Sequence, residues 1–194
     1  MYNKIIRVIT IVPIMAFAML TIMYCLRPVL FGSIMQYVFA VLFLTVLPML
    51  AYPLQPVIPK YKNAGREGQR NLAIVMAVIG YVLGIVVAIC TDATKAVWII
   101  YLTYLFSGMG IVIFNKLIKF RASGHACGIA GPITILVYFI GPSGFWGLPV
   151  FILSLFSSLA MKRHTIVQFL LGSGIAVLAF FISVLLADAR ILTA

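Results

Sequence analysis

Charged residues are scarce in this sequence, and acidic residues are the scarcest of them. Only 9% of the 194 residues are charged, and only three are Asp or Glu. A soluble domain usually has about 25% charged residues. Because 64% of the residues are hydrophobic, a water-soluble fold could not hide the apolar surface. The composition therefore predicts an integral membrane protein with one domain, residues 1–194, and no soluble module.

Residues that could bind a metal are also few. The chain has two histidines and three cysteines, and none of the cysteines belongs to a CxxC pair. Cys25, Cys90 and Cys127 lie in or beside apolar segments, so we predict that they are buried small hydrophobic side chains rather than disulfide or metal-binding residues. The usual ligand spacings cannot assemble a metal cage from this set. We expect neither a metal nor any other cofactor.

Positive charge is abundant by comparison, with a net charge of +11. The cations lie in short connections between apolar stretches rather than on a long polar face. This distribution is typical of contact with lipid headgroups or an anionic ligand, and it argues against a nucleic-acid partner. Oligomeric state leaves no signal in the sequence.

Seven apolar stretches dominate the chain. They cover Ile5–Leu26, Ser33–Tyr52, Asn71–Cys90, Ala96–Phe114, Ser123–Ile140, Trp146–Met161 and Ile166–Leu186. Most approach the ~20 residues that a helix needs to cross the hydrocarbon core, although the fifth and sixth are short. A membrane-spanning backbone must satisfy its own hydrogen bonds, which favours helices. The predicted fold is an all-α bundle with six or seven transmembrane helices.

Seven spans would place the N-terminus and the connections 55–70, 115–122 and 162–165 on one side of the membrane, here called face A. Face A would hold 11 of the 14 cations: Lys4, Arg7, Lys60, Lys62, Arg66, Arg70, Lys116, Lys119, Arg121, Lys162 and Arg163. The positive-inside rule would make face A cytoplasmic. If seven of these cations serve a binding site, the remaining charges do not fix the orientation.

Both histidines of the chain fall on face A, each at the mouth of an apolar stretch. Lys119 and Arg121 precede His125, and a second pair of cations, Lys162 and Arg163, precedes His164. Phosphoryl transfer needs cations for the phosphate oxygens, a nucleophile, and an acid for the leaving oxygen. A histidine can serve as nucleophile or acid near neutral pH.

The start of the fifth stretch is a second feature that suits a phosphate. Ser123 can cap a helix that begins beside it. The backbone amides of Ser123, Gly124 and His125 would then point at an anion at the helix N-terminus.

Two segments resemble motifs of the type 2 phosphatidic acid phosphatase superfamily. RASGH at 121–125 is similar to its second motif, and RHTIVQFLLGSG at 163–174 is similar to its third. Short bacterial members are the best match, through residues Arg121, Ser123, His125, His164, Thr165, Gln168 and Gly172. The resemblance implies a metal-independent lipid phosphatase of the bacterial inner (plasma) membrane. Its substrate would be phosphatidic acid, phosphatidylglycerol phosphate or a polyprenyl diphosphate.

The resemblance also implies roles for individual residues. His164 would attack phosphorus and form a phosphohistidine, and His125 would protonate the leaving group. Gln168, four residues after His164, would orient the nucleophile. The residues expected to hold the phosphate are Ser123, Gly124, Arg121, Lys119, Lys162, Arg163, Arg66 and Arg70. Lys4, Arg7, Lys60 and Lys62 are assigned instead to headgroup anchoring.

The chain departs from the superfamily pattern at several positions. Ala122 replaces the proline of the second motif, Ser158 occupies the place of an arginine, and Gln168 occupies that of the orienting acid. A separate first motif is missing, and Lys116, Lys119 and Arg121 are candidates for a compressed version. Because a glutamine cannot stabilise an imidazolium as a carboxylate does, we expect these changes to affect the rate of phosphate hydrolysis.

Two other functions fit parts of the sequence. GPSG at 141–144 matches the Gly-x-Ser-Gly pattern of rhomboid-type intramembrane proteases, with Ser143 as nucleophile, but the span count places Ser143 opposite both histidines. A non-catalytic binder or transporter of lipid phosphates would explain the missing acid and arginine. The absence of charges in the middle of the spans argues against a transport pathway.

Overall fold

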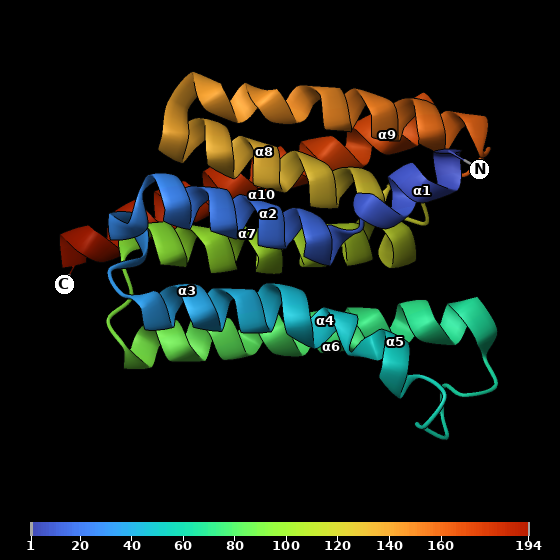
Figure 1. Cartoon of the computed structure of the whole chain (residues 1–194), viewed down its shortest axis with the longest axis horizontal. Coiled ribbons are helices and arrows are strands. Elements are labelled where there is room, and N and C mark those ends of the chain that lie inside the picture. Colours follow the sequence, from blue (N-terminus) through green and yellow to red (C-terminus); the bar gives the residue numbers. More distant parts are fainter. Residues whose placement is uncertain (1, 194) are drawn as a thin grey trace.

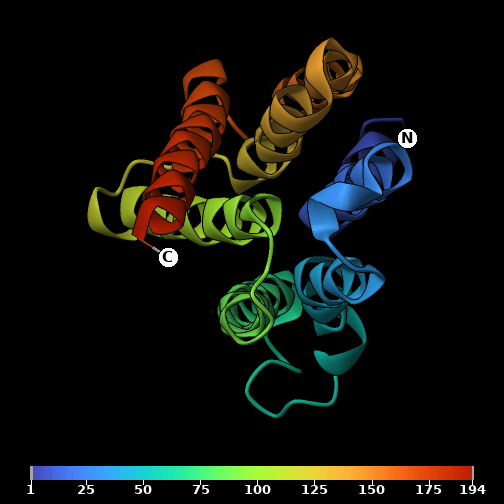
Figure 2. The same ribbon diagram turned by 90° about the vertical axis from the view of Figure 1, so that its left-hand side faces the viewer.

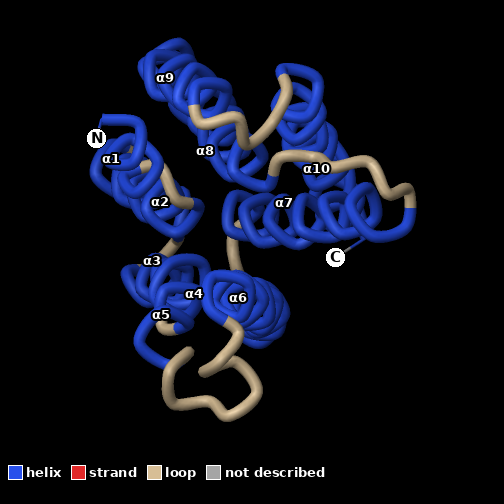
Figure 3. The backbone as a smooth tube through the Cα atoms, turned by 90° about the vertical axis from the view of Figure 1, so that its right-hand side faces the viewer, coloured by secondary structure: helices blue, strands red, loops and turns tan. Residues whose placement is uncertain are grey.

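The fold is that of a computed structural model, which describes residues 2–193. Within this range every regular element is helical, and the helices lie side by side in an elongated bundle (Figure 1). Figure 3 shows the same helices from one end, joined by loops. The all-α prediction is confirmed.

The first half of the chain forms several interrupted helices. They are α1 (Tyr2–Ile9), α2 (Val12–Leu26), the 3₁₀ turn η1 (Pro28–Phe31), α3 (Ile34–Val41), the π-helical segment η2 (Leu42–Val46), α4 (Leu47–Met49) and α5 (Ala51–Leu54). The predicted stretch Ile5–Leu26 is therefore not one helix. A break at Thr10 and Ile11 separates α1 from α2, and a proline, Pro13, lies in the first turn of α2. Proline suits this position because it needs no intrahelical donor there.

The second half has longer helices. They are α6 (Gly65–Cys90), α7 (Lys95–Val112) with its π-helical extension η3 (Ile113–Leu117), α8 (Gly124–Ile140), the 3₁₀ segment η4 (Gly141–Gly147), α9 (Leu148–Ala160) and α10 (Ile166–Thr193). Thr94 and Ser123 cap α7 and α8 with their hydroxyl oxygens. Gly141 ends α8 in a conformation with φ +74° that favours glycine, and the chain turns back through η4 into α9 (Figure 1).

Five helical stretches are long and apolar enough to cross a membrane. They are Ile34–Leu54, Gly65–Cys90, Lys95–Leu117, Gly124–Ala160 and Ile166–Ala189, and Val12–Leu26 is a shorter apolar helix. The stretch Gly124–Ala160 contains the α8–α9 hairpin. The protein is thus an integral membrane protein by the length and composition of its helices, and the prediction of six or seven spans stays a prediction.

Close helix contacts use small residues, as is usual where lipid supplies no hydrophobic driving force between helices. Gly84 of α6 faces the ring of Tyr101. A small apolar cluster that includes Ala122, Cys127 and Ala176 joins the start of α8 to α10. The prediction of buried thiols is confirmed for Cys127 only. Cys25 and Cys90 are exposed, because an apolar side chain on a membrane helix can face lipid instead of protein.

The segments assigned to face A lie at one end of the bundle. Figure 1 shows α1, the loop after α5, the end of α7 and the α9–α10 connection at its right-hand end. The opposite end holds η1, the α6–α7 turn, η4 and the C-terminal part of α10 (Figure 2). The name face A is kept below for the end that contains α1.

Candidate active site

The start of α8 is fixed to the start of α10. Ser123 is fully buried, and its Oγ accepts a hydrogen bond of 3.2 Å from the Ala126 amide. The Ser123 amide donates to the backbone oxygen of Gln168 at 3.0 Å. Gly172, one turn further along α10, leaves no room for a Cβ beside the Ser123 carbonyl. The two family-like motifs are therefore held together backbone to backbone.

His164 lies between α9 and α10 and contacts Gln168, as predicted. The distance between His164 Nδ1 and Gln168 Oε1 is 3.3 Å, and the Thr165 amide donates to the same Oε1 at 3.2 Å. A backbone N–H can only donate, so this second bond identifies Oε1 as the amide oxygen. Nδ1 of His164 must then carry the hydrogen. Its Nε2 keeps a lone pair, which is what a nucleophile requires.

The surroundings of His164 favour the neutral ring. Partial burial lowers its pKa below the usual value of 6.5, and the charges of Arg121, Arg7 and Arg163 lower it further. The hydrogen bond to Gln168 acts in the opposite direction and raises the pKa. Burial and like charge both disfavour an imidazolium. The lone pair on Nε2 is consequently available at neutral pH.

His125 lies in the first turn of α8 and is half-buried. Its Nε2 is 3.0 Å from Oγ1 of Thr10, in the break between α1 and α2. The charges that reach His125 are those of Arg7 and His164. The two histidines thus belong to one site, to which α1, α8 and the α9–α10 connection contribute.

Arg7 is a site residue that sequence reasoning missed. It was assigned to headgroup anchoring, but the structure places it half-buried in α1, within electrostatic reach of both histidines. Arg163 and Arg66 are also near enough to repel it. A signal was present in the sequence, because Arg7 interrupts the otherwise apolar run IIRVI.

The other predicted phosphate ligands divide into two groups. Arg66, Arg121 and Arg163 are exposed but act electrostatically on Arg7 or His164. Arg70, Lys119 and Lys162 are exposed. Their charges are not among those that act on the two histidines. Lys119 and Lys162 are the turn residues before each motif, with φ of +58° and +51°. Gly124, the first residue of α8, adjoins His125.

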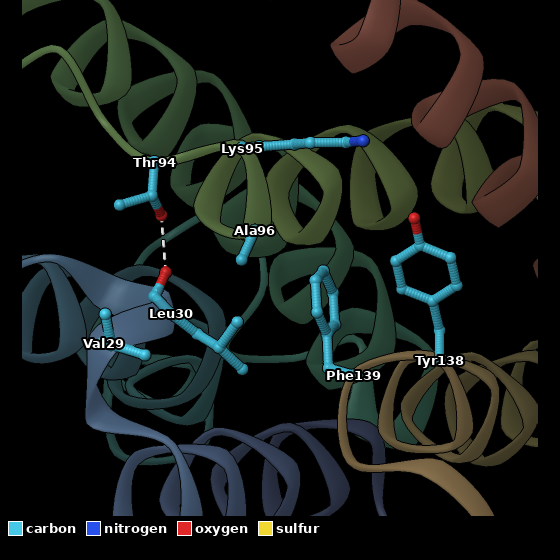
Figure 4. A pocket seen from close by; sticks show the side chains of 7 residues that line it. All are labelled: Val29, Leu30, Thr94, Lys95, Ala96, Tyr138 and Phe139. Carbon is cyan, nitrogen blue, oxygen red and sulfur yellow. Dashed lines mark hydrogen bonds between the residues drawn. The ribbon is translucent and has the colours of Figure 1, made fainter.

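The opposite end of the bundle holds the remaining candidates. Ser143 is exposed in η4, at the end of the bundle opposite both histidines, so the structure does not pair it with either of them (Figure 1). A cavity of about 300 Å³ also lies at that end, between η1, the start of α7 and the end of α8 (Figure 4). The residues that line it are Val29, Leu30, Thr94, Lys95, Ala96, Tyr138 and Phe139. None of the sequence-predicted site residues belongs to this cavity.

Comparison with known proteins identifies no relative of this chain. No protein-family model matches it, and no curated protein and no solved structure matches it. The likeness to the phosphatase superfamily rests on residues 121–125 and 163–174 alone.

Proposed function

We propose that this protein is a membrane-embedded phosphatase that hydrolyses a lipid phosphate or diphosphate through a phosphohistidine. One observation carries the proposal. Both histidines of the chain meet at one end of an apolar bundle, and the charge of Arg7 reaches both of them. The hydrogen on His164 is on Nδ1, which leaves Nε2 free to attack.

The reaction has two steps with two roles for His125. In the first, Nε2 of His164 attacks phosphorus, and the phosphorus–oxygen bond of the ester breaks with its electron pair on the leaving oxygen. His125 gives that oxygen a proton. In the second, His125 takes a proton from water while the water oxygen attacks the phosphohistidine. The nitrogen–phosphorus bond breaks, its electron pair returns to Nε2, and phosphate leaves.

The arginines around the histidines suit a phosphate group. Arg7, Arg121 and Arg163 act on His164, and Arg66 acts on Arg7. The one ion pair among the described side chains, Lys95 with Asp188, lies at the other end of the bundle. Cations that repel one another are stabilised by a bound anion, and arginine matches phosphate geometry well. Gly124 would add a helix N-terminal amide.

A lipid is the substrate class that fits the position of the site. The helical stretches that carry His125 and flank His164 are long and apolar, so an acyl or prenyl tail can lie against them while the phosphate sits at face A. We propose six or seven spans in the bacterial inner membrane, with membrane lipids as surroundings. Phosphatidic acid, phosphatidylglycerol phosphate and a polyprenyl diphosphate are the substrates to test.

The test is phosphate release from these lipids in detergent, with a chelator present. His164→Ala should abolish release, and His125→Ala should reduce it strongly. Lys60→Ala is the matched control, because Lys60 is an exposed cation of the face A loop that lies over the ring of Tyr61. It should leave the rate unchanged.

Three results would count against this function or modify it. Release that survives His164→Ala would show that the nucleophile is misassigned. Equal losses in His164→Ala and Lys60→Ala would indicate a general surface-charge effect. If the wild type releases no phosphate but binds a lipid phosphate, the chain is the non-catalytic binder or transporter considered above.

A further inference from the structure

Thr10 makes two hydrogen bonds that together fix the position of one proton. Its Oγ1 donates to the backbone oxygen of Ile6 at 2.7 Å and lies 3.0 Å from Nε2 of His125. A hydroxyl has one hydrogen, and a carbonyl oxygen can only accept. Since that hydrogen is used by Ile6, Thr10 must accept a hydrogen from His125. Nε2 of His125 therefore carries a hydrogen.

We propose that Thr10 is a positioning residue, which holds His125 in its Nε2–H form so that Nδ1 is the nitrogen that exchanges the catalytic proton. The catalytic role of this proton rests on the proposed function, whereas the position of the hydrogen on Nε2 does not. In the first step His125 reacts as the imidazolium, with a hydrogen on both nitrogens. The Nδ1–H bond breaks, its electron pair stays on Nδ1, and the proton passes to the leaving oxygen, which leaves the neutral Nε2–H ring. In the second step Nδ1 takes a proton from the attacking water.

Burial keeps Thr10 in contact with both of its partners. Thr10 is 4% exposed, so water cannot replace either of its partners. A buried hydroxyl left without a partner is costly, which favours the arrangement with both bonds made. The charged groups that act on His125 are Arg7 from α1 and His164 from the α9–α10 connection. Neither of them accounts for a hydrogen on Nε2, whereas Thr10 does.

A purely structural role for Thr10 is the competing explanation. Threonine hydroxyls often bond to the carbonyl four residues earlier, with no functional consequence. If that were the whole role of Thr10, removing its hydroxyl would leave the His125 tautomer unchanged. The tautomer therefore distinguishes the two explanations, and its measurement does not require activity.

The chain is well suited to that measurement because it has only two histidines. In a His164→Ala protein made without a polyhistidine tag, His125 is the only ¹⁵N-labelled imidazole. We expect its detergent-micelle NMR spectrum, at a pH where the ring is neutral, to show hydrogen on Nε2 and a bare Nδ1. Thr10→Ser should preserve this pattern, and Thr10→Val should give a mixture of tautomers.

A second measurement tests the consequence for turnover with both histidines present. Thr10→Val should lower kcat about 10- to 100-fold, a fraction of what general acid catalysis contributes, with KM little changed. Thr10→Ser should restore kcat. Thr10→Ala serves as a second variant if the valine protein is not folded, as judged by its melting temperature.

The possible outcomes separate the two proposals. A Thr10→Val or Thr10→Ala spectrum identical to that of the Thr10 protein, or a hydrogen found on Nδ1 of His125, would overturn the role of Thr10. So would an unchanged kcat. If the wild type releases no phosphate, the phosphatase proposal fails, and the spectra alone still decide whether Thr10 sets the tautomer.

Discussion

Gly172 of α10 lies directly against the backbone carbonyl of Ser123, so that a Cβ at position 172 would overlap the carbonyl oxygen. This contact brings the second turn of α10 to the N-terminus of α8. It also aligns the Ser123 amide with the Gln168 carbonyl at 3.0 Å. The distance between the two histidine-bearing segments therefore depends on one missing side chain.

Gly172→Ala should destabilise the protein and its site together. The obstacle is a backbone atom, which cannot rotate away, and overpacking of this kind costs about 1–3 kcal/mol. We expect a lower melting temperature and a loss of phosphate release. Gly174→Ala is the matched control, because open space surrounds that position. Equal melting temperatures for the two variants would contradict the close contact at Gly172.

Gln168→Glu should move the acidic limb of the pH–rate profile to higher pH. His164 must be neutral to attack, so activity is kept as the pH falls below 6.5 and is lost on passing through its lowered pKa. A carboxylate in place of the Gln168 oxygen, 3.3 Å from Nδ1, would favour the imidazolium and raise that pKa. The profile of kcat against pH measures the shift.

Gln168→Leu should shift the pH–rate profile in the opposite direction. It removes the hydrogen bond that raises the His164 pKa, so the acidic limb should move to lower pH. Movement of both variants in the same direction would show that Gln168 does not act through the ionisation of His164.

Arg7→Ala should lower kcat/KM without lowering stability. Loss of one charge-assisted hydrogen bond of about 1.5–3 kcal/mol corresponds to roughly a 10- to 100-fold decrease. The folded protein loses little stability, because Arg163 and Arg66 repel the Arg7 charge. Arg7→Lys should recover part of the rate, since lysine keeps the charge but not the planar fork. A fall in melting temperature that matches the loss of activity would mean that Arg7 is structural.

Cysteine labelling should place Ser143 and Lys162 on opposite sides of the membrane. Both residues are exposed, and they lie at opposite ends of the α8–α9 hairpin. In a chain whose three native cysteines are replaced by alanine, Ser143→Cys and Lys162→Cys should react with a membrane-impermeant maleimide from different sides of sealed vesicles. If both variants were labelled from the same side, a pairing of Ser143 with a histidine would again be possible.

Hydropathy predicted where helices lie but not where they begin and end. The stretch predicted as Asn71–Cys90 is a helix from Gly65, because the polar turn before Asn71 remains helical outside the apolar region. The stretch predicted as Ile166–Leu186 continues to Thr193. An apolar run reports the part of a helix that avoids water, whereas hydrogen bonds and caps determine its ends.

The candidate site divides in the same way between local and distant contacts. The contact of His164 with Gln168 was predicted from their spacing of four residues. The reason differs in the structure, because His164 precedes α10 and Gln168 reaches back to it from the first turn, where its Oε1 also accepts from the Thr165 amide. The contact of His125 with Thr10 could not be predicted, since 115 residues separate them. No local pattern links the break after α1 to the first turn of α8.

Three properties of this protein can be read from its residues alone: the chain is helical, it belongs in a membrane, and cations accompany both of its histidines. These properties follow from composition and from spacing along the chain. The folded chain is needed to see that Arg7 and Thr10 join the histidines and that Ser143 does not. Packing of α1 against α9 and of α2 against α8 brings those side chains together, and such packing depends on the fit of whole helices rather than on any short segment.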